Sequence, residues 1–160
     1  MEVKQIMGII IAGIVACLAM DIFQRVLLIT SGQPPSNWAV VGRWAFNVLR
    51  TAHLYQPAIE SSAEITGERA FGWVVHYAVG IGYAFVYAVF MQKGLLTASL
   101  PDGLIFGILS VIVPWFFFLP VMGKGIMGRH TPTPTKVSML ALANHCVFGL
   151  GMAAGFQVSV

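Results

Sequence analysis

The chain has 160 residues, of which 58% are hydrophobic and only 9% are charged. An ordinary soluble domain carries about 25% charged residues, so 9 basic and 6 acidic side chains are too few to cover a soluble globule of this length. The same scarcity excludes a nucleic-acid-binding protein, which needs a dense basic surface. The composition therefore predicts an integral membrane protein whose main partner is the lipid bilayer.

Four apolar runs are long enough to cross a bilayer as helices, which takes about 20 residues. They cover residues 6–30, 70–91, 103–122 and 137–158. Helix is the expected form, because backbone groups in lipid must be hydrogen-bonded within the segment, and no run shows the alternation of a barrel strand. We predict an all-α protein, a four-helix transmembrane bundle in which residues 1–160 form a single transmembrane domain.

An amphipathic helix is expected over residues 37–50, between the first two spans. Arg43 and Arg50 share one face of this helix and should meet polar partners, whereas Trp38 lies on a face directed to lipid or core. A helix of this kind lies at the headgroup level of a membrane. Glu68, at the mouth of the second span, is the nearest carboxylate expected to pair with Arg43.

The basic residues are distributed unequally between the two ends of the predicted spans. Lys4 and Lys93 flank one side, and the other basic residues flank the opposite side: Arg25, Arg43, Arg50, Arg69, Lys124, Arg129 and Lys136. Because cytoplasmic loops are enriched in Lys and Arg, the loops 31–69 and 123–136 are expected inside the cell. This predicts a multi-pass protein of the inner (cytoplasmic) membrane with both termini outside.

Three ionisable side chains fall well inside the predicted spans. Counted from the basic side at 1.5 Å per residue, Asp21, His76 and His145 lie roughly 9–14 Å deep in a core about 30 Å thick. Pro114 falls in the same layer, where it should bend the third span and free a carbonyl group. Intramembrane ionisable groups are costly and usually face a bundle interior or water. The pattern predicts a site near the midplane that binds or transports a small solute, a proton or a metal ion.

The second and fourth spans share the pattern H-x-x-x-G-x-G, at residues 76–82 and 145–151. Such a repeat predicts two tandem helical hairpins related by an axis along the membrane normal. His76 and His145 would then face one interior space, with Asp21 at its border. Glycines four residues apart in the third and fourth spans are typical of close helix crossings, either within the chain or in a homodimer.

Four motifs extend through nearly the whole chain: NWAVVGRW at 37–44, GERAFGWVVHY at 67–77, TPTP at 131–134 and HCVFGLG at 145–151. They resemble the bacterial family catalogued as domain of unknown function 2938. The resemblance implies a small multi-span inner-membrane protein and supplies no activity. It also implies that the family pattern includes Arg43, Trp44, Glu68, Trp73, His76 and His145.

The expected ligand-binding set combines the membrane-embedded groups with these motif residues: Asp21, Arg25, Arg43, Trp44, Glu68, Trp73, His76, Tyr77 and His145. No catalytic residue is predicted, and an enzyme is the less favoured class. No cofactor is expected, although a transition metal at His76, His145 and Asp21, or a haem between the paired histidines, stays open. A structural or accessory subunit of a membrane complex, acting as a homodimer or with a partner membrane protein, is the main alternative.

Overall fold

The computed structural model describes residues 2–159, and within them the chain forms helices and loops without a β-strand. The elements in order are α1 (Val3–Ser31), α2 (Trp38–Thr51), η1 (Ile59–Ser61), α3 (Glu68–Gln92), α4 (Leu100–Ser110), the π-helix η2 (Pro114–Phe118), α5 (Leu119–Val121), η3 (Ile126–Gly128) and α6 (Pro134–Val158). The segments long and apolar enough to cross a membrane are Val3–Ser31, Glu68–Gln92, Leu100–Val121 and Pro134–Val158. The all-helical fold is thereby confirmed, and each of the four predicted runs lies in a helix long and apolar enough to cross a membrane.

The helices begin earlier than the apolar runs predicted. Each of the four spans starts two or three residues before the predicted boundary, at Val3, Glu68, Leu100 and Pro134. The first turns contain the polar residues Lys4, Glu68 and Asp102, or a proline, which a hydropathy boundary excludes. Acidic side chains and proline are favourable in the first turn of a helix, so the helical backbone continues past the apolar segment.

The chain divides into two compact units. Unit 1 comprises Met1–Ser36, Tyr77–Ser110 and Ala143–Val160, and unit 2 comprises Asn37–His76 and Val111–Leu142. Helices α3 and α6 each begin in unit 2 and continue into unit 1 without a break in the helix. The prediction of a single transmembrane domain over residues 1–160 stays a prediction.

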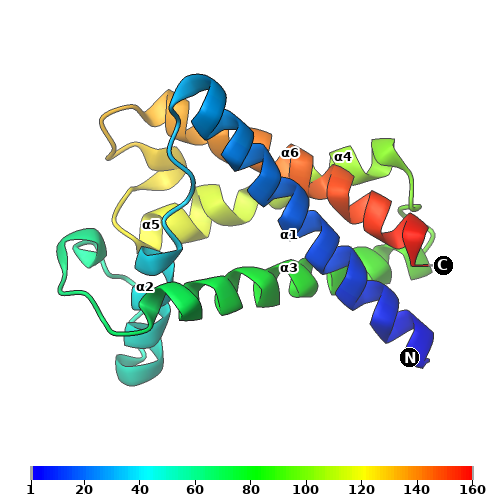
Figure 1. The fold of residues 1–160 in the computed structure, drawn as a ribbon, viewed down its shortest axis with the longest axis horizontal. Helices are drawn as coiled ribbons and strands as arrows, with labels where there is room; N and C mark the ends of the chain where they lie inside the picture. The colour runs from blue at the N-terminus through cyan, green and yellow to red at the C-terminus, as the bar shows by residue number, and fades with distance from the viewer. Residues whose placement is uncertain (1, 160) are drawn as a thin grey trace. The chain divides into compact units, whose positions relative to one another are not determined.

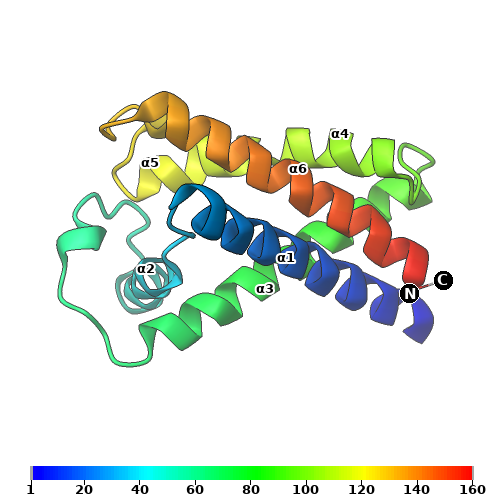
Figure 2. The same cartoon turned by 45° about the horizontal axis from the view of Figure 1, so that its top comes forward.

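In unit 1, α1 packs closely against the C-terminal half of α6, and the start of α1 lies beside the end of α6 (Figures 1 and 2). A Cβ atom on Gly155 would come within 2.5 Å of the Cα of Ala12, and one on Gly151 within 3.0 Å of the Cα of Ala16. Helix backbones approach this closely only where one residue has no side chain.

The helix α4 crosses the same half of α6 through a second pair of glycines. A Cβ atom on Gly103 would come within 2.5 Å of the carbonyl oxygen of Gly149, and one on Gly107 would overlap the carbonyl oxygen of His145. The small residues that could have formed a homodimer contact are therefore used inside the chain. The homodimer itself stays a prediction.

Pro114 interrupts the third span as predicted, and it does so with a π-helical segment over Pro114–Phe118. Because proline has no backbone N–H, the carbonyl group of Ser110, four residues earlier, lacks its usual helical donor. Within unit 1 this carbonyl accepts a hydrogen bond of 3.3 Å from the Tyr83 hydroxyl. The freed carbonyl becomes part of a polar centre.

In unit 2, α2 forms close to the predicted boundaries of 37–50. Asn37 caps the helix, and its side-chain oxygen accepts hydrogen bonds from the backbone N–H groups of Ala39 and Val40. A Cβ atom on Gly42 would overlap the carbonyl oxygen of Glu68 at the start of α3. The apolar face of α2 packs in a cluster of buried residues from three segments: Val40, Trp44, Ala45, Ile59 and Met122.

Candidate functional site

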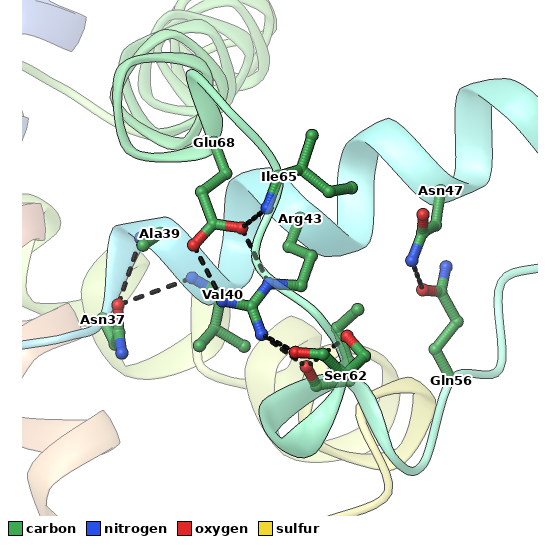
Figure 3. A network of polar contacts seen from close by, with 10 residues as sticks. Asn37, Ala39, Val40, Arg43, Asn47, Gln56, Ser62, Ile65 and Glu68 are labelled. Atoms are coloured by element: carbon green, nitrogen blue, oxygen red, sulfur yellow. Dashed lines mark hydrogen bonds and ion pairs between the residues drawn. The ribbon is translucent and has the colours of Figure 1, made fainter.

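A buried ion pair joins α2 to the first residue of α3 in unit 2 (Figure 3). The Arg43 guanidinium donates from Nε to Glu68 Oε2 at 2.7 Å and from Nη2 to Glu68 Oε1 at 2.8 Å. The remaining nitrogen, Nη1, donates to the carbonyl oxygens of Ser62 at 2.6 Å and Ile59 at 3.2 Å. Glu68 Oε2 also accepts the backbone N–H of Ile65 at 2.8 Å. The predicted pairing of these two residues is observed.

This centre is buried, and each nitrogen of the guanidinium has an acceptor. The side chains of Arg43 and Glu68 are only 5% and 9% exposed, and the pairing is bidentate, which fixes both position and orientation. The hydrogen bond to Glu68 raises the pKa of Arg43, so the guanidinium remains charged. Trp44, on the next position of α2, donates from Nε1 to the carbonyl oxygen of Leu54 at 2.8 Å. The arrangement anchors α2 and the following loop to α3.

His76 lies between two tryptophans in the same unit. Its ring stacks on Trp38 with ring centroids 4.0 Å apart, and it meets the ring of Trp73 edge-on at 5.6 Å. His76 is buried, with 6% of its surface exposed. Trp38, which was predicted to face lipid or core, covers one face of the imidazole.

In unit 1, Asp21 of α1 contacts α3. The Tyr77 hydroxyl donates a hydrogen bond of 3.1 Å to Asp21 Oδ2. Cys17 lies one turn earlier on α1, fully buried, and a Cβ atom on Gly80 of α3 would overlap its sulfur. Asp21 and Tyr77, both in the predicted set, therefore meet where α1 packs against α3.

His145 of α6 forms a second polar centre in unit 1, with groups from α3 and α4. Its Nδ1 lies 2.7 Å from Ser110 Oγ, and Tyr83 meets the imidazole edge-on at 6.1 Å. Ser110 is thus held between His145 and the Tyr83 hydroxyl that binds its carbonyl group. The ring of Phe148 packs against the rings of Tyr83 and His145, with ring centroids 5.5 and 5.9 Å apart. Phe148 is thus the apolar member of this cluster.

The remaining predicted residues are placed less informatively. Arg25 is exposed on α1, and Arg50 is exposed in the last turn of α2. His76 belongs to unit 2 and His145 to unit 1, so their meeting in one interior space stays a prediction. Over residues 2–159, no group of three or more His, Cys, Asp and Glu side chains lies close enough to hold a metal ion.

Sequence reasoning missed two polar residues of unit 1. Ser110 bonds His145, and Gln24 is buried one turn beyond Asp21 on α1. Both are polar residues inside apolar runs. Ser110 lies four residues before Pro114 and Gln24 lies three residues after Asp21, and these spacings could have indicated them. Serine and glutamine carry no charge, so a search for ionisable groups passes over them.

The family comparison agrees with the motifs. The family model described as "Protein of unknown function (DUF2938)" matches residues 10–159. No curated protein and no solved structure matches the chain. Since the matched region includes all four spans almost completely, the chain belongs to the DUF2938 family of proteins of unknown function.

Proposed function

We propose that this protein is a multi-pass inner-membrane protein that binds a small polar solute or a proton inside unit 1 and passes it across the bilayer. Asp21 and His145 are the titratable groups of the proposed path, and Tyr77, Ser110 and Tyr83 are their hydroxyl-bearing neighbours. In this proposal the Arg43–Glu68 ion pair of unit 2 holds the backbone and takes no part in transport.

The proposal depends most on one observation, which is that Asp21 and His145 both form hydrogen bonds with hydroxyl groups. Asp21 and His145 lie in segments of membrane-spanning length, and each is bonded to a hydroxyl group from a different helix. A hydroxyl group both donates and accepts hydrogen bonds, so it stays bonded when its neighbour gains or loses a proton. Buried ionisable residues in spans commonly mark proton or substrate pathways.

The two centres are also connected within unit 1. Cys17 meets α3 at Gly80, and a Cβ atom on Gly80 would lie 3.8 Å from the ring of Phe148, which contacts His145. The absent side chain at Gly80 therefore leaves the thiol and this ring close together. A path from Asp21 to His145 would pass beside this contact, and water would carry a proton past the phenyl ring, which has no hydrogen-bonding group.

Proton uptake into proteoliposomes tests the proposal. The purified protein is reconstituted with a pH-sensitive dye inside, and a potassium gradient with valinomycin drives protons inward. We expect Asp21→Asn and His145→Ala to reduce uptake about tenfold, since proton transfer groups contribute factors of that order or more. Asp102→Asn is the matched control, because Asp102 bonds Thr97 at the start of α4. Uptake no faster than in empty vesicles, or unchanged by Asp21→Asn, would contradict the proposal.

The proposed orientation places both termini outside and α2 at the cytoplasmic headgroup level. It is supported by the unequal distribution of basic residues and by the exposed Arg50 in the last turn of α2. Reporter fusions at the C-terminus that are active in the periplasm, together with a reporter in the loop after α5 that is active in the cytoplasm, would agree with it. The reverse pattern would contradict it.

A structural or accessory subunit is the second candidate. Two features favour it: the close helix contacts at glycines inside unit 1 and the buried Arg43–Glu68 ion pair in unit 2. Both hold the backbone in place. Co-purification of a membrane partner, combined with proteoliposomes that take up no protons, would favour it. Visible absorbance or stoichiometric metal in the purified protein would instead favour the haem or metal alternatives.

A further inference from the structure

Gln24 is a glutamine buried inside the first span of unit 1, with 5% of its surface exposed. Its Oε1 accepts a hydrogen bond of 2.8 Å from the backbone N–H of Ser36. This bond fixes the orientation of the amide, because an N–H group can only meet its oxygen end. Over the described residues 2–159, the buried Nε2 of Gln24 has no hydrogen-bond partner.

A buried donor of this kind is rare in proteins, because nearly all buried polar groups have a hydrogen-bond partner. Replacing the amide by an apolar side chain would remove the cost of burying it. The Nε2 group therefore requires an explanation, and a ligand that accepts its hydrogen bond is one.

Gln24 lies on the same face of α1 as Asp21, which bears the carboxylate of the proposed path. Gly13, Cys17 and Asp21 mark the stripe of α1 that contacts α3. Gln24 continues this stripe one turn beyond Asp21, and residues three apart on a helix have Cβ atoms about 5–6 Å from each other. This spacing matches the length of a small molecule with one polar group at each end. Asp21 is the only acidic residue of α1.

We propose that Gln24 and Asp21 together bind a small primary amine that also carries a carbonyl oxygen. The protonated amine pairs with the Asp21 carboxylate, and the carbonyl oxygen accepts the hydrogen bond from Gln24 Nε2. This inference rests on the proposed function and names the class of solute that the path would take.

The two side chains exclude other ligand classes. A simple anion would be repelled by Asp21, and a metal cation would meet an N–H donor where it needs an oxygen ligand. An amine without an acceptor atom would pair with Asp21 and leave the buried donor unsatisfied. A bound water molecule would satisfy Nε2 as well, and the experiment separates this outcome.

The test compares two amines that differ in the acceptor. The full-length protein in nanodiscs is heated with increasing concentrations of glycinamide, which has an amine and a carbonyl oxygen, or of methylammonium, which has only the amine. Ligands that bind the folded state raise the unfolding midpoint, and the concentration at which the midpoint begins to rise gives the affinity. We expect glycinamide to bind the unaltered chain about tenfold more tightly than methylammonium, the effect of one good hydrogen bond to a buried group.

Variants identify the groups responsible. In Gln24→Leu the preference for glycinamide should disappear while methylammonium still binds, and Gln24→Met is a second variant of similar length. Gln5→Leu is the matched control, because Gln5 is exposed near the start of the same helix. In Asp21→Asn both amines should lose affinity.

Each outcome decides between the proposals. A preference that persists in Gln24→Leu or Gln24→Met would overturn the inference. So would an unaltered chain that binds both amines equally or neither of them, which is the result expected if Nε2 holds only water. If these results accompany proton uptake that depends on Asp21, the proposed function stands and only the solute class is wrong. Proton uptake independent of Asp21 would instead overturn the proposed function.

Discussion

Arg43 of unit 2 and Asp21 of unit 1 are both ionisable side chains on helices, but the partners that they bond differ in kind. Arg43 donates four hydrogen bonds, two to a carboxylate and two to backbone carbonyls. Asp21 accepts a hydrogen bond from the Tyr77 phenolic hydroxyl, and Nε2 of the neighbouring Gln24 has no hydrogen-bond partner among the described residues. Every guanidinium nitrogen of Arg43 has an acceptor in the first arrangement, whereas the second includes a buried donor, Gln24 Nε2, without one among the described residues.

The comparison separates two uses of polar groups in a protein of very apolar composition. Fixed acceptors and a bidentate ion pair bind one charge state and one geometry, which suits anchoring of the backbone. Hydroxyl partners tolerate more than one protonation state, which suits transfer or exchange of a proton or solute. Changes in unit 2 should therefore mainly affect folding, and changes to the hydroxyl groups of unit 1 should mainly affect transport.

The largest effect on stability is expected where α2 and α3 touch through their backbones. A Cβ atom on Gly72 would overlap the carbonyl oxygen of Trp38. Gly72→Ala should lower the free energy of unfolding by about 3 kcal/mol, the upper end for overpacking. Gly82→Ala is the control on the same helix, since nothing lies within 4 Å of its added Cβ. Equal thermal midpoints for the two variants would contradict the close contact.

The next effect concerns the ion pair itself. Arg43→Met and Glu68→Met should each greatly reduce the yield of folded protein, because each leaves one buried charge unpaired. The double variant should recover much of the loss, since it removes both charges together. Thermal unfolding of the two single variants and the double variant in detergent measures the interaction energy between Arg43 and Glu68. Lys124→Met is the control, because Lys124 pairs with Glu60 where both side chains are partly exposed, and a loss below about 1 kcal/mol is expected there. Additive losses would mean that the pair is not coupled.

A smaller effect on stability, and a larger one on transport, is expected at Ser110. Ser110→Ala removes the partner of His145 Nδ1 and should reduce proton uptake about tenfold, while it destabilises the fold by about 1–3 kcal/mol. Ser138→Ala is the control, because Ser138 is equally buried and its hydroxyl donates to the carbonyl oxygen of Met127 in unit 2. If both variants lose stability alike and neither changes uptake, the Ser110–His145 bond is structural.

The smallest effect is expected for Tyr77→Phe. This variant keeps the ring and removes only the hydroxyl that bonds Asp21, so stability should fall by about 1 kcal/mol and proton uptake by a few-fold. Tyr87→Phe is matched on the same helix, where the hydroxyl donates to the carbonyl oxygen of Thr97 at 2.7 Å. Similar uptake by the two variants would remove Tyr77 from the proposed path.

Much of the helical architecture followed from the sequence because its physical signals are local. Runs of apolar residues identify the spans, and the arginines of residues 37–50 recur with helical periodicity, so α2 forms within one residue of the predicted bounds. The pairing of Arg43 with Glu68 was also predictable, since a buried arginine needs an acidic partner and Glu68 stands at the start of the next span. The break at Pro114 followed from the chemistry of the proline ring.

Helix contacts, in contrast, were decided only by the tertiary structure. The spans are apolar on every side, so no polar face shows which residues point to lipid and which to a neighbouring helix. The glycines of α4 and α6 are visible in the sequence, but their positions do not show that Gly103 contacts Gly149 inside the same chain. It could not show that Ser110 bonds His145, because two residues from separate spans become neighbours only when the helices pack. The same packing buries the Gln24 amide, a neutral group whose significance depends on what surrounds it.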